Sequence, residues 1–249
     1  MPQYSIIIPA YNEGARLGAT LDRVLSYVAE RGWAAEVIVV NDGSRDNTAE
    51  LVQTRAKTNP ALRLVENPGN HGKGYSVRNG MLKANGEILL FTDADLSAPI
   101  EQASKLFAAV ELGADVAVGS RWLQPDLQAQ RQSVLRQFYG RSFNLVLRFL
   151  LGLKFKDTQC GFKAFRRNAA QTLFSMQTVE GWGFDAELLY IADRLGMKIK
   201  EVPVVWSDAA GTRIHPLRDS MKMMAEVLRI RWNALRGKYP RNYAAAEHA

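Results

Sequence analysis

Two aspartates separated by one residue, Asp93-Ala94-Asp95, are the residues of this chain best suited to chemistry. They follow an apolar run over residues 88–92, which predicts a buried strand, so both carboxylates come where that strand leaves its sheet. Two carboxylates held together repel each other unless a cation joins them, and oxygen-only ligation suits Mg²⁺ or Mn²⁺. The pair therefore predicts a divalent-metal site. The alternative is a solvated loop or a helix cap, because Ser97 and Pro99 follow and a helix is expected to start there.

The elements that must position this pair alternate between strands and helices over the first 120 residues. Apolar runs predict strands at residues 4–8, 36–40, 62–65, 87–92 and 115–118. Apolar residues at helical spacing predict helices at residues 14–31, from a cap at Asp46 or Asn47 to about Lys57, at 73–84 and at 99–112. This alternation indicates an α/β fold with a doubly wound, mostly parallel sheet.

Polar motifs follow four of the predicted strands. They are Pro9-Ala10-Tyr11-Asn12-Glu13, Asn41-Asp42-Gly43-Ser44, Asp93-Ala94-Asp95 and Gly119-Ser120-Arg121. In open α/β sheets ligands bind outside the carboxyl ends of the strands. The placement therefore predicts one shared site.

A glycine-containing segment, Asn70-His71-Gly72-Lys73-Gly74, opens the third predicted helix. Glycines let a backbone approach a ligand closely, and the amides at a helix N-terminus attract anions. The spacing of a Walker P-loop is absent, and no G-x-G-x-x-G motif follows the first strand. The segment is either part of an anion-binding site or a plain left-handed turn.

The pattern changes after residue 121. Residues 123–131 predict a loop, residues 132–151, 184–194 and 216–236 predict helices, and residues 160–165 and 198–205 predict strands. We interpret this half as a C-terminal elaboration of a single domain over residues 1–237, divided at residue 121 and followed by a flexible tail over 238–249.

Composition limits the class of protein. The chain has 249 residues, of which 47% are hydrophobic and 23% charged, which is ordinary for a folded soluble protein. Its net charge of +7 favours anionic partners, but no nucleic-acid recognition motif is present, so nucleic acid is not an expected partner. The single cysteine, Cys160, excludes an internal disulfide. Neither a secretory signal nor a transmembrane helix is expected.

Together these segments resemble glycosyltransferase family 2, whose members have the GT-A fold. The resemblance rests on residues 5–13, 39–46 and 92–95. The family usually has two aspartates before the glycine, whereas this chain has Asn41 and Asp42. Three further segments resemble the dolichyl-phosphate β-glucosyltransferases and other polyprenyl-phosphate hexosyltransferases; they are Asn70–Met81, Asp157–Lys163 and Val179–Tyr190.

The resemblance implies an inverting, metal-dependent transfer of a hexose to a polyprenyl or dolichyl phosphate, with UDP-glucose as the foremost donor and Mg²⁺ or Mn²⁺ as cofactor. Two alternatives stay open, a GDP-mannose-dependent mannosyltransferase and a family 2 enzyme acting on a hydroxyl acceptor. A nucleotide-sugar-binding protein without catalysis is disfavoured, because Asp93, Asp95, Arg121 and Asp185 are all present.

The resemblance also assigns roles to residues. In the nucleotide-sugar part, residues 1–121, the donor would be bound by Pro9, Tyr11, Glu13, Asp42, Lys73 and Asp93-Ala94-Asp95. The metal ligands would be Asp93, Asp95 and Ser97. In the acceptor part, residues 122–237 with Arg121 at its start, acceptor binding would fall to Arg121, Arg136, Trp182 and Arg213. The catalytic residues would be Asp95, Asp185 and Arg121.

Two of these residues have simpler alternatives. Asp185 would be the general base if the acceptor were a hydroxyl, and a hydrogen-bonding residue if it were a phosphate; it could instead cap the helix that follows. Trp182 would offer an apolar face to the sugar, or it could belong to the core.

A polyprenyl phosphate lies in a bilayer, so part of the chain is expected to contact a membrane surface. Residues 132–151 and 216–236 combine apolar residues at helical spacing with Arg and Lys. This pattern favours membrane contact for residues 132–151 and leaves membrane contact and core packing equally open for residues 216–236. The alternative is that both stripes pack on the core of the domain. The expected location is cytoplasmic, with peripheral association at the cytoplasmic face of a membrane.

Overall fold

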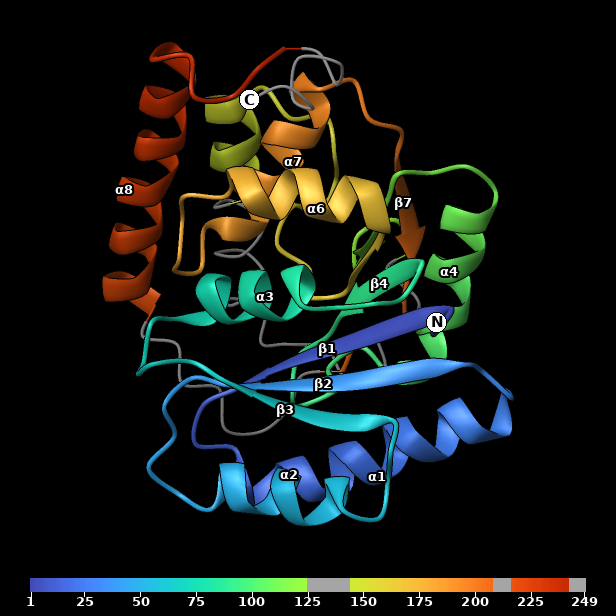
Figure 1. The fold of residues 1–249 in the computed structure, drawn as a ribbon. Helices are drawn as coiled ribbons and strands as arrows, with labels where there is room; N and C mark the ends of the chain where they lie inside the picture. Colours follow the sequence, from blue (N-terminus) through green and yellow to red (C-terminus); the bar gives the residue numbers. More distant parts are fainter. Residues whose placement is uncertain (125–143, 208–215, 242–249) are drawn as a thin grey trace.

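In a computed structural model, residues 1–124, 144–207 and 216–241 are described, and a seven-stranded sheet forms their centre (Figure 1). The strands are β1 (Tyr4–Ala10), β2 (Ala35–Asn41), β3 (Leu62–Glu66), β4 (Ile88–Phe91), β5 (Val116–Ser120), β6 (Lys163–Arg166) and β7 (Ile199–Pro203). Their order in the sheet is β3-β2-β1-β4-β6-β5-β7. β6 is antiparallel to both of its neighbours, and the other pairs are parallel.

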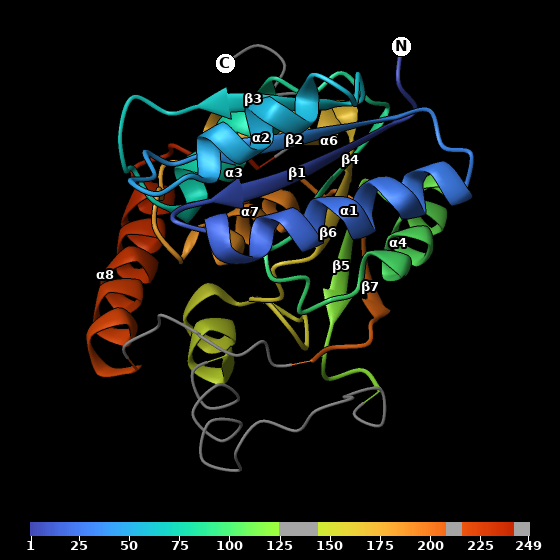
Figure 2. The ribbon, with the colours of Figure 1, turned by 90° about the horizontal axis from the view of Figure 1, so that it is seen from below.

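Helices cover both faces of the sheet. They are α1 (Gly14–Glu30), α2 (Thr48–Ala56), α3 (Lys73–Leu82), η1 (Ile100–Gln102), α4 (Ala103–Glu111), α6 (Arg167–Met176), α7 (Phe184–Arg194) and α8 (Pro216–Leu235). Residues 144–151 are also helical. Seen from below, α1, α2 and α4 lie on one face, whereas α3, α6 and α7 lie on the other (Figure 2).

Alternate residues of each strand enter two separate cores. Ile7 of β1 packs with α3 and α6–α8, whereas its neighbours Ile6 and Ile8 pack with α1 and α4. Because both faces are covered, β1 and β4 are apolar along nearly all of their length, as their sequences predicted. The predicted α/β fold with a doubly wound, mostly parallel sheet is confirmed.

Most predicted elements are present, with ends shifted by one to three residues. One helix was not predicted: α6 buries Ala169, Ala170, Leu173 and Phe174, a helical spacing that the sequence contains. The strand expected at residues 160–165 begins only at Lys163. Of the predicted loop 123–131 and helix 132–151, residues 125–143 lie outside the described residues.

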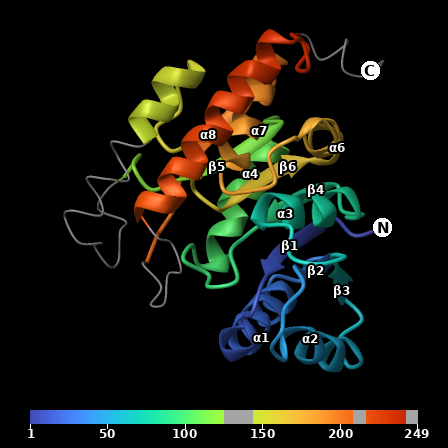
Figure 3. The ribbon, with the colours of Figure 1, turned by 90° about the vertical axis from the view of Figure 1, so that its left-hand side faces the viewer.

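Helical residues 144–151 lie beside α8 at one edge of the molecule (Figure 3). Leu147 and Leu151 share a core with Val227 and Ile230 of α8, so each of these helices buries one face. No helix within the described ranges is long and apolar enough to cross a bilayer.

Tight packing of α3 on the sheet gives a first prediction. A Cβ atom on Gly80 would lie 2.6 Å from Cγ2 of Ile7 and 2.7 Å from Cγ2 of Val40. We expect Gly80→Ala to lower the free energy of unfolding by about 1–3 kcal/mol, because the added methyl overpacks the interface between helix and sheet. Urea denaturation followed by circular dichroism measures this.

The matched control is Gly18→Ala in α1. There a Cβ atom would lie 3.1 Å from Nη2 of Arg55, the far end of a long side chain that forms a surface ion pair with Asp22. We expect this substitution to raise the free energy of unfolding by about 0.5–1 kcal/mol through helix propensity. Equal effects at the two glycines would contradict the packing argument.

Candidate active site

Asp93 and Asp95 follow the carboxyl end of β4, in a turn that holds its own shape. The amide of Thr92 donates to the carbonyl of Ile7, and the amide of Ser97 donates to Oδ1 of Asp95 at 3.0 Å. Leu96, which lies between Asp95 and Ser97, has a φ of 47°. Such backbone conformations are costly for a residue with a Cβ atom and occur often at functional sites.

Lys73, at the start of α3, lies against the first of these aspartates. Its Nζ is 2.6 Å from Oδ1 of Asp93 and 5.1 Å from the centre of the Trp182 ring. Burial raises the pKa of the Asp93 carboxyl, and the nearby Asp95 adds to this, although Lys73 opposes both. Burial opposes the charge of Lys73, but Asp93 and Asp185 outweigh it and raise the pKa of the ammonium.

This turn fits a hard divalent cation. The Asp95 carboxylate stands close enough to Asp93 to raise the pKa of the Asp93 carboxyl, and the ligand atoms of both side chains are oxygen. Within the described ranges no group of three or more His, Cys, Asp or Glu side chains gathers as a metal site. Magnesium in nucleotide enzymes is commonly held by one or two carboxylates together with substrate phosphates, so two carboxylates are sufficient. Ser97 is buried beside Asp95, and its amide supports that carboxylate.

The loop after β1 lies next to the same turn. Glu13 forms a two-pronged ion pair with Arg16, whose Nη1 is also 3.9 Å from Oδ2 of Asp95. The loop is anchored by the amide of Asn12, which donates to Ser44, and Asn12 has a φ of 52°. The side chain of Tyr11 is exposed. Arg16 thus connects two residues that the sequence assigned to the nucleotide and the metal.

Asp42, after β2, is buried and shapes the glycine-containing segment. Its carboxylate accepts hydrogen bonds from the amides of His71 and Gly72, at 3.0 and 2.8 Å, and from the side chain of Asn67. Gly72 has a φ of 105° and precedes α3, so this anchoring places Lys73 at the start of the helix. The carboxylate of Asp42 therefore holds the segment in place.

Arg121, after β5, is held by an ion pair with Asp157. The side-chain Nε and Nη2 donate to the two carboxylate oxygens at 2.7 and 2.9 Å, and the backbone amide donates to the same group. Burial alone would raise the pKa of the Asp157 carboxyl, but Arg121 lowers it below its usual range. The guanidinium also lies 5.0 Å from the ring of Trp206.

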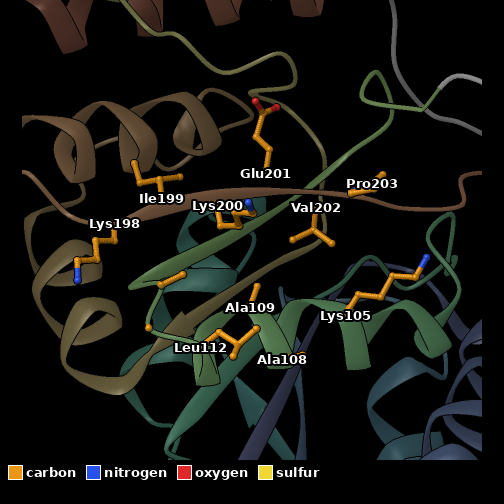
Figure 4. Close-up of a pocket in the computed structure, with 12 residues that line it drawn as sticks. Lys105, Ala108, Ala109, Leu112, Lys198, Ile199, Lys200, Glu201, Val202 and Pro203 are labelled. Atoms are coloured by element: carbon orange, nitrogen blue, oxygen red, sulfur yellow. The ribbon is translucent and has the colours of Figure 1, made fainter.

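Asp157 is itself positioned by a residue on the edge strand β7. Glu201 on β7 accepts hydrogen bonds from the amides of Lys156 and Asp157 at 2.9 and 3.0 Å. Glu201 is one of the residues that line a groove between β7 and α4, and Figure 4 shows its side chain directed away from α4. Lys198 and Lys200 lie beside and on β7, the edge strand of the sheet, and such charges keep an edge strand from pairing with another chain.

Asp185, in the first turn of α7, forms a buried ion pair with Lys163. The Lys163 side chain is 0% exposed, and its Nζ also donates to the carbonyl of Cys160 at 2.6 Å. Lys163 reaches this place because the register of β6 pairs it with Phe91 of β4 and Val118 of β5. Gly183 occupies the N-cap position of α7, so Asp185 is not the cap. Burial, followed by the Asp157 carboxylate, raises the pKa of the Cys160 thiol to about 12, so this thiol is not a nucleophile.

The loop that carries Trp182 packs against the start of α3. Trp182 is 45% exposed and therefore does not belong to the core. The carbonyl of Glu180 accepts a hydrogen bond from the amide of Tyr75, and a Cβ atom on Gly74 would collide with the same carbonyl. A Cβ atom on Gly161 would lie within 3.0 Å of Lys73 and against the Asp93 carboxylate. These glycines let four segments meet around Asp93.

The structure therefore brings together most of the residues that the sequence singled out. Around Asp93 it places Asp95, Ser97, Lys73, Asp185 and Trp182, and Arg16 links Glu13 to Asp95. Arg136 and Arg213 lie outside the described residues. The sequence assigned no role to Arg16, Asp157 and Lys163, although the last two lie in the segment Asp157–Lys163, which carries part of the family resemblance.

Comparisons with known proteins agree with this fold. The family model described as "Glycosyl transferase family 2" matches residues 5–174. Solved structures of glucosyl-3-phosphoglycerate synthase from Mycobacterium tuberculosis share the fold. One, in complex with UDP, superposes with a TM-score of 0.67 at 24% identity and covers 92% of this chain and 80% of that chain. Another, with Mn²⁺, UDP-glucose and phosphoglyceric acid, has a TM-score of 0.69 at 21% identity and covers 92% and 79%.

The chain belongs to glycosyl transferase family 2 and is a glycosyltransferase with the GT-A fold. Within the family it is similar to dolichyl-phosphate beta-glucosyltransferases. The protein of that name from Trichomonas vaginalis is 36% identical over 91% of this chain and 70% of its own length. The human protein is 35% identical over 95% and 77%, and the Saccharomyces cerevisiae protein 34% identical over 96% and 77%.

The buried pair of Lys163 and Asp185 gives a second prediction. We expect Lys163→Met to lower the free energy of unfolding by about 3–5 kcal/mol, because Asp185 is then left buried without its partner. Adding Asp185→Asn should recover much of that loss, since the unpaired charge is removed. Urea denaturation of the two single variants and the double variant measures this coupling. Additive losses in the double variant would show that the two side chains do not depend on each other.

Proposed function

We propose that this chain transfers glucose, with inversion, from UDP-glucose to the phosphate of a polyprenyl or dolichyl lipid, using Mg²⁺ or Mn²⁺. The observation that carries the proposal is the 34–37% identity, over nine-tenths of the chain, to proteins named dolichyl-phosphate beta-glucosyltransferase. The UDP and Mn²⁺ in the similar solved structures support the choice of nucleotide and cofactor. In this proposal residues 1–121 bind the donor, and residues 122–237 of the same domain face the acceptor.

On the donor side, Asp93 and Asp95 would hold the cation, with Ser97 or a water beside them. When bound, the cation stabilises the negative charge of the departing diphosphate. Lys73 adds a fixed positive charge at the same place, 2.6 Å from Asp93. The loops after β1 and β2, with Pro9, Tyr11, Glu13 and Asp42, would hold the base and ribose.

On the acceptor side, the chemistry favours a phosphate over a hydroxyl. A lipid phosphate is already an anion near neutral pH, so positioning and charge neutralisation suffice, whereas a hydroxyl needs a base to remove its proton. Asp185 is the residue suited to that task, and Lys163 already binds one of its oxygens. In this proposal Asp185 orients the sugar or the acceptor, Trp182 offers the sugar an apolar face, and Arg121 with Arg136 and Arg213 attracts phosphate.

The lipid acceptor requires contact with a membrane surface, which the outer faces of two adjacent helices support. Phe149 and Leu145 are exposed on helical residues 144–151, at 86% and 62%. On α8 the exposed apolar residues are Met221, Leu228, Trp232 and Leu235, and basic residues lie between them. Such a surface suits peripheral binding to an anionic bilayer, here assigned to the cytoplasmic face.

The proposal predicts a labelled lipid. Purified protein incubated with polyprenyl phosphate, Mg²⁺ and radiolabelled UDP-glucose should make organic-soluble label. Asp93→Asn and Asp95→Asn should each lower the turnover rate about 100-fold or more, because the charge on the leaving diphosphate is no longer neutralised. The same variants should lose the Mn²⁺-dependent part of UDP affinity in calorimetry. Asp193→Asn, an exposed position on α7, serves as control.

Each alternative predicts a different result in this assay. Label transferred from GDP-mannose but not from UDP-glucose would support the mannosyltransferase. Release of UDP with glucose found only in a water-soluble product would support a hydroxyl acceptor. Unchanged transfer by Asp93→Asn would overturn the assignment of the site itself.

Membrane contact gives a separate prediction. Wild-type protein should sediment with anionic liposomes and be released by high salt, since screening weakens the attraction. The double substitution Phe149→Ser and Leu235→Ser should weaken liposome binding about 10-fold or more, because two apolar anchors are lost. Leu112→Ser, at an exposed position after α4, is the matched control. Indifference of the wild type to liposomes would count against a lipid acceptor.

A further inference from the structure

α8 presents two different faces along its length. Val227, Ile230 and Asn233 are buried against the domain, whereas Leu228 and Trp232 are exposed. Glu226 stands in line with Ile230 and Asn233 at helical spacing, so it belongs to the inner face. A carboxylate on the inner face of such a helix requires a partner, because a buried charge without one is costly.

The partner of Glu226 is the loop Gly181-Trp182-Gly183. The amide of Gly183 donates a hydrogen bond to Oε2 of Glu226 at 2.7 Å. A Cβ atom on Gly183 would lie 2.7 Å from that oxygen, and a Cβ atom on Gly181 would overlap the other one. Two glycines thus leave the space that the carboxylate fills.

The loop Gly181-Trp182-Gly183 is connected to the proposed site through the residue before Gly183 and through the helix after it. Trp182 lies under the ammonium of Lys73, which is paired with Asp93. Gly183 is the N-cap of α7, whose first turn carries Asp185. A negative charge at the N-terminus of a helix is also favourable there. Burial, aided by Glu187, raises the pKa of the Glu226 carboxyl, as expected for a charge removed from water.

We infer that Glu226 is a positioning residue for acceptor binding. Through the amide of Gly183, the Glu226 carboxylate fixes the Trp182 loop and the start of α7. The inner face of α8 is thereby linked to the site, and the outer face of the same helix meets the lipid surface. The inference rests on the proposed function, because it assumes a lipid phosphate as acceptor. It predicts that loss of the hydrogen bond loosens the loop and weakens acceptor binding, with a smaller effect on turnover.

The test compares Glu226→Ala with Glu226→Gln. The alanine removes the acceptor oxygen, whereas the glutamine keeps an oxygen of similar reach. In Glu226→Ala we expect the KM for polyprenyl phosphate to rise about 10-fold, with kcat changed by less, because one hydrogen bond to a charged group is lost. Amide hydrogen exchange in the peptide over residues 180–184 should become faster by a similar factor. Glu226→Gln should retain most of the acceptor affinity, and its amide exchange should stay as slow as in the wild type.

Two further variants keep the test decisive. Gly183→Ala leaves Glu226 in place but displaces its carboxylate, so it should reproduce the faster exchange and higher KM even if Glu226→Ala does not fold. Glu30→Ala removes an exposed carboxylate at the end of α1 and should change neither quantity.

The outcomes separate this inference from the proposed function. If wild-type protein makes labelled lipid but Glu226→Ala keeps its acceptor KM and its exchange rates, the inference is overturned and the function stands. If wild-type protein makes no labelled lipid, the proposed function fails, and with it the acceptor role of Glu226. If Glu226→Gln is as impaired as Glu226→Ala, the charge of Glu226 rather than its hydrogen bond is responsible, and the inference as stated is wrong.

Discussion

Carboxylates collected at one edge of a sheet repel each other, and the active-site half of this structure depends on how that repulsion is offset. Lys73 approaches Asp93, Lys163 approaches Asp185, and Arg121 holds Asp157. Each cation comes from a different element than the acid it neutralises, so each pair also fixes one segment against another. Asp95 has a longer ion pair, with Nη1 of Arg16 at 3.9 Å. The net effect is a preorganised negative turn surrounded by positive charge, which suits a cation and a diphosphate together.

Sequence patterns predicted the N-terminal half of the molecule well. β1, β2 and β4 are largely apolar runs of four to seven residues, and a polar motif follows each of them, so the sequence predicts both the sheet and a gathering of Glu13, Asp42 and Asp93 at its edge. The predicted bounds of α7 agree with the structure at both ends. These features are local or follow from the topology of parallel sheets. The periodicity of apolar residues in the sequence is therefore enough to predict them.

The partners of the acidic residues could not be inferred in the same way. Lys163 is near Asp185 because β6 runs antiparallel between β4 and β5. The four-residue sequence of β6 does not indicate whether the strand runs parallel or antiparallel to its neighbours. Glu226 meets Gly183 across 43 residues, and Glu201 meets Lys156 across 45. The glycines at 161, 181 and 183 were visible in the sequence, but what fills the space beside each is a tertiary property.

The reversed direction of β6 also determines how the C-terminal half is attached to the sheet. β5 ends at the edge where Asp93 lies, and β6, running the other way, begins at that same edge. The chain between Arg121 and Lys163 therefore departs from and returns to one side of the sheet without having to traverse it. Closing a longer or shorter loop between fixed ends costs little free energy. Relatives could accordingly lengthen, shorten or replace this excursion to suit a new acceptor while the strands and the donor side keep their register.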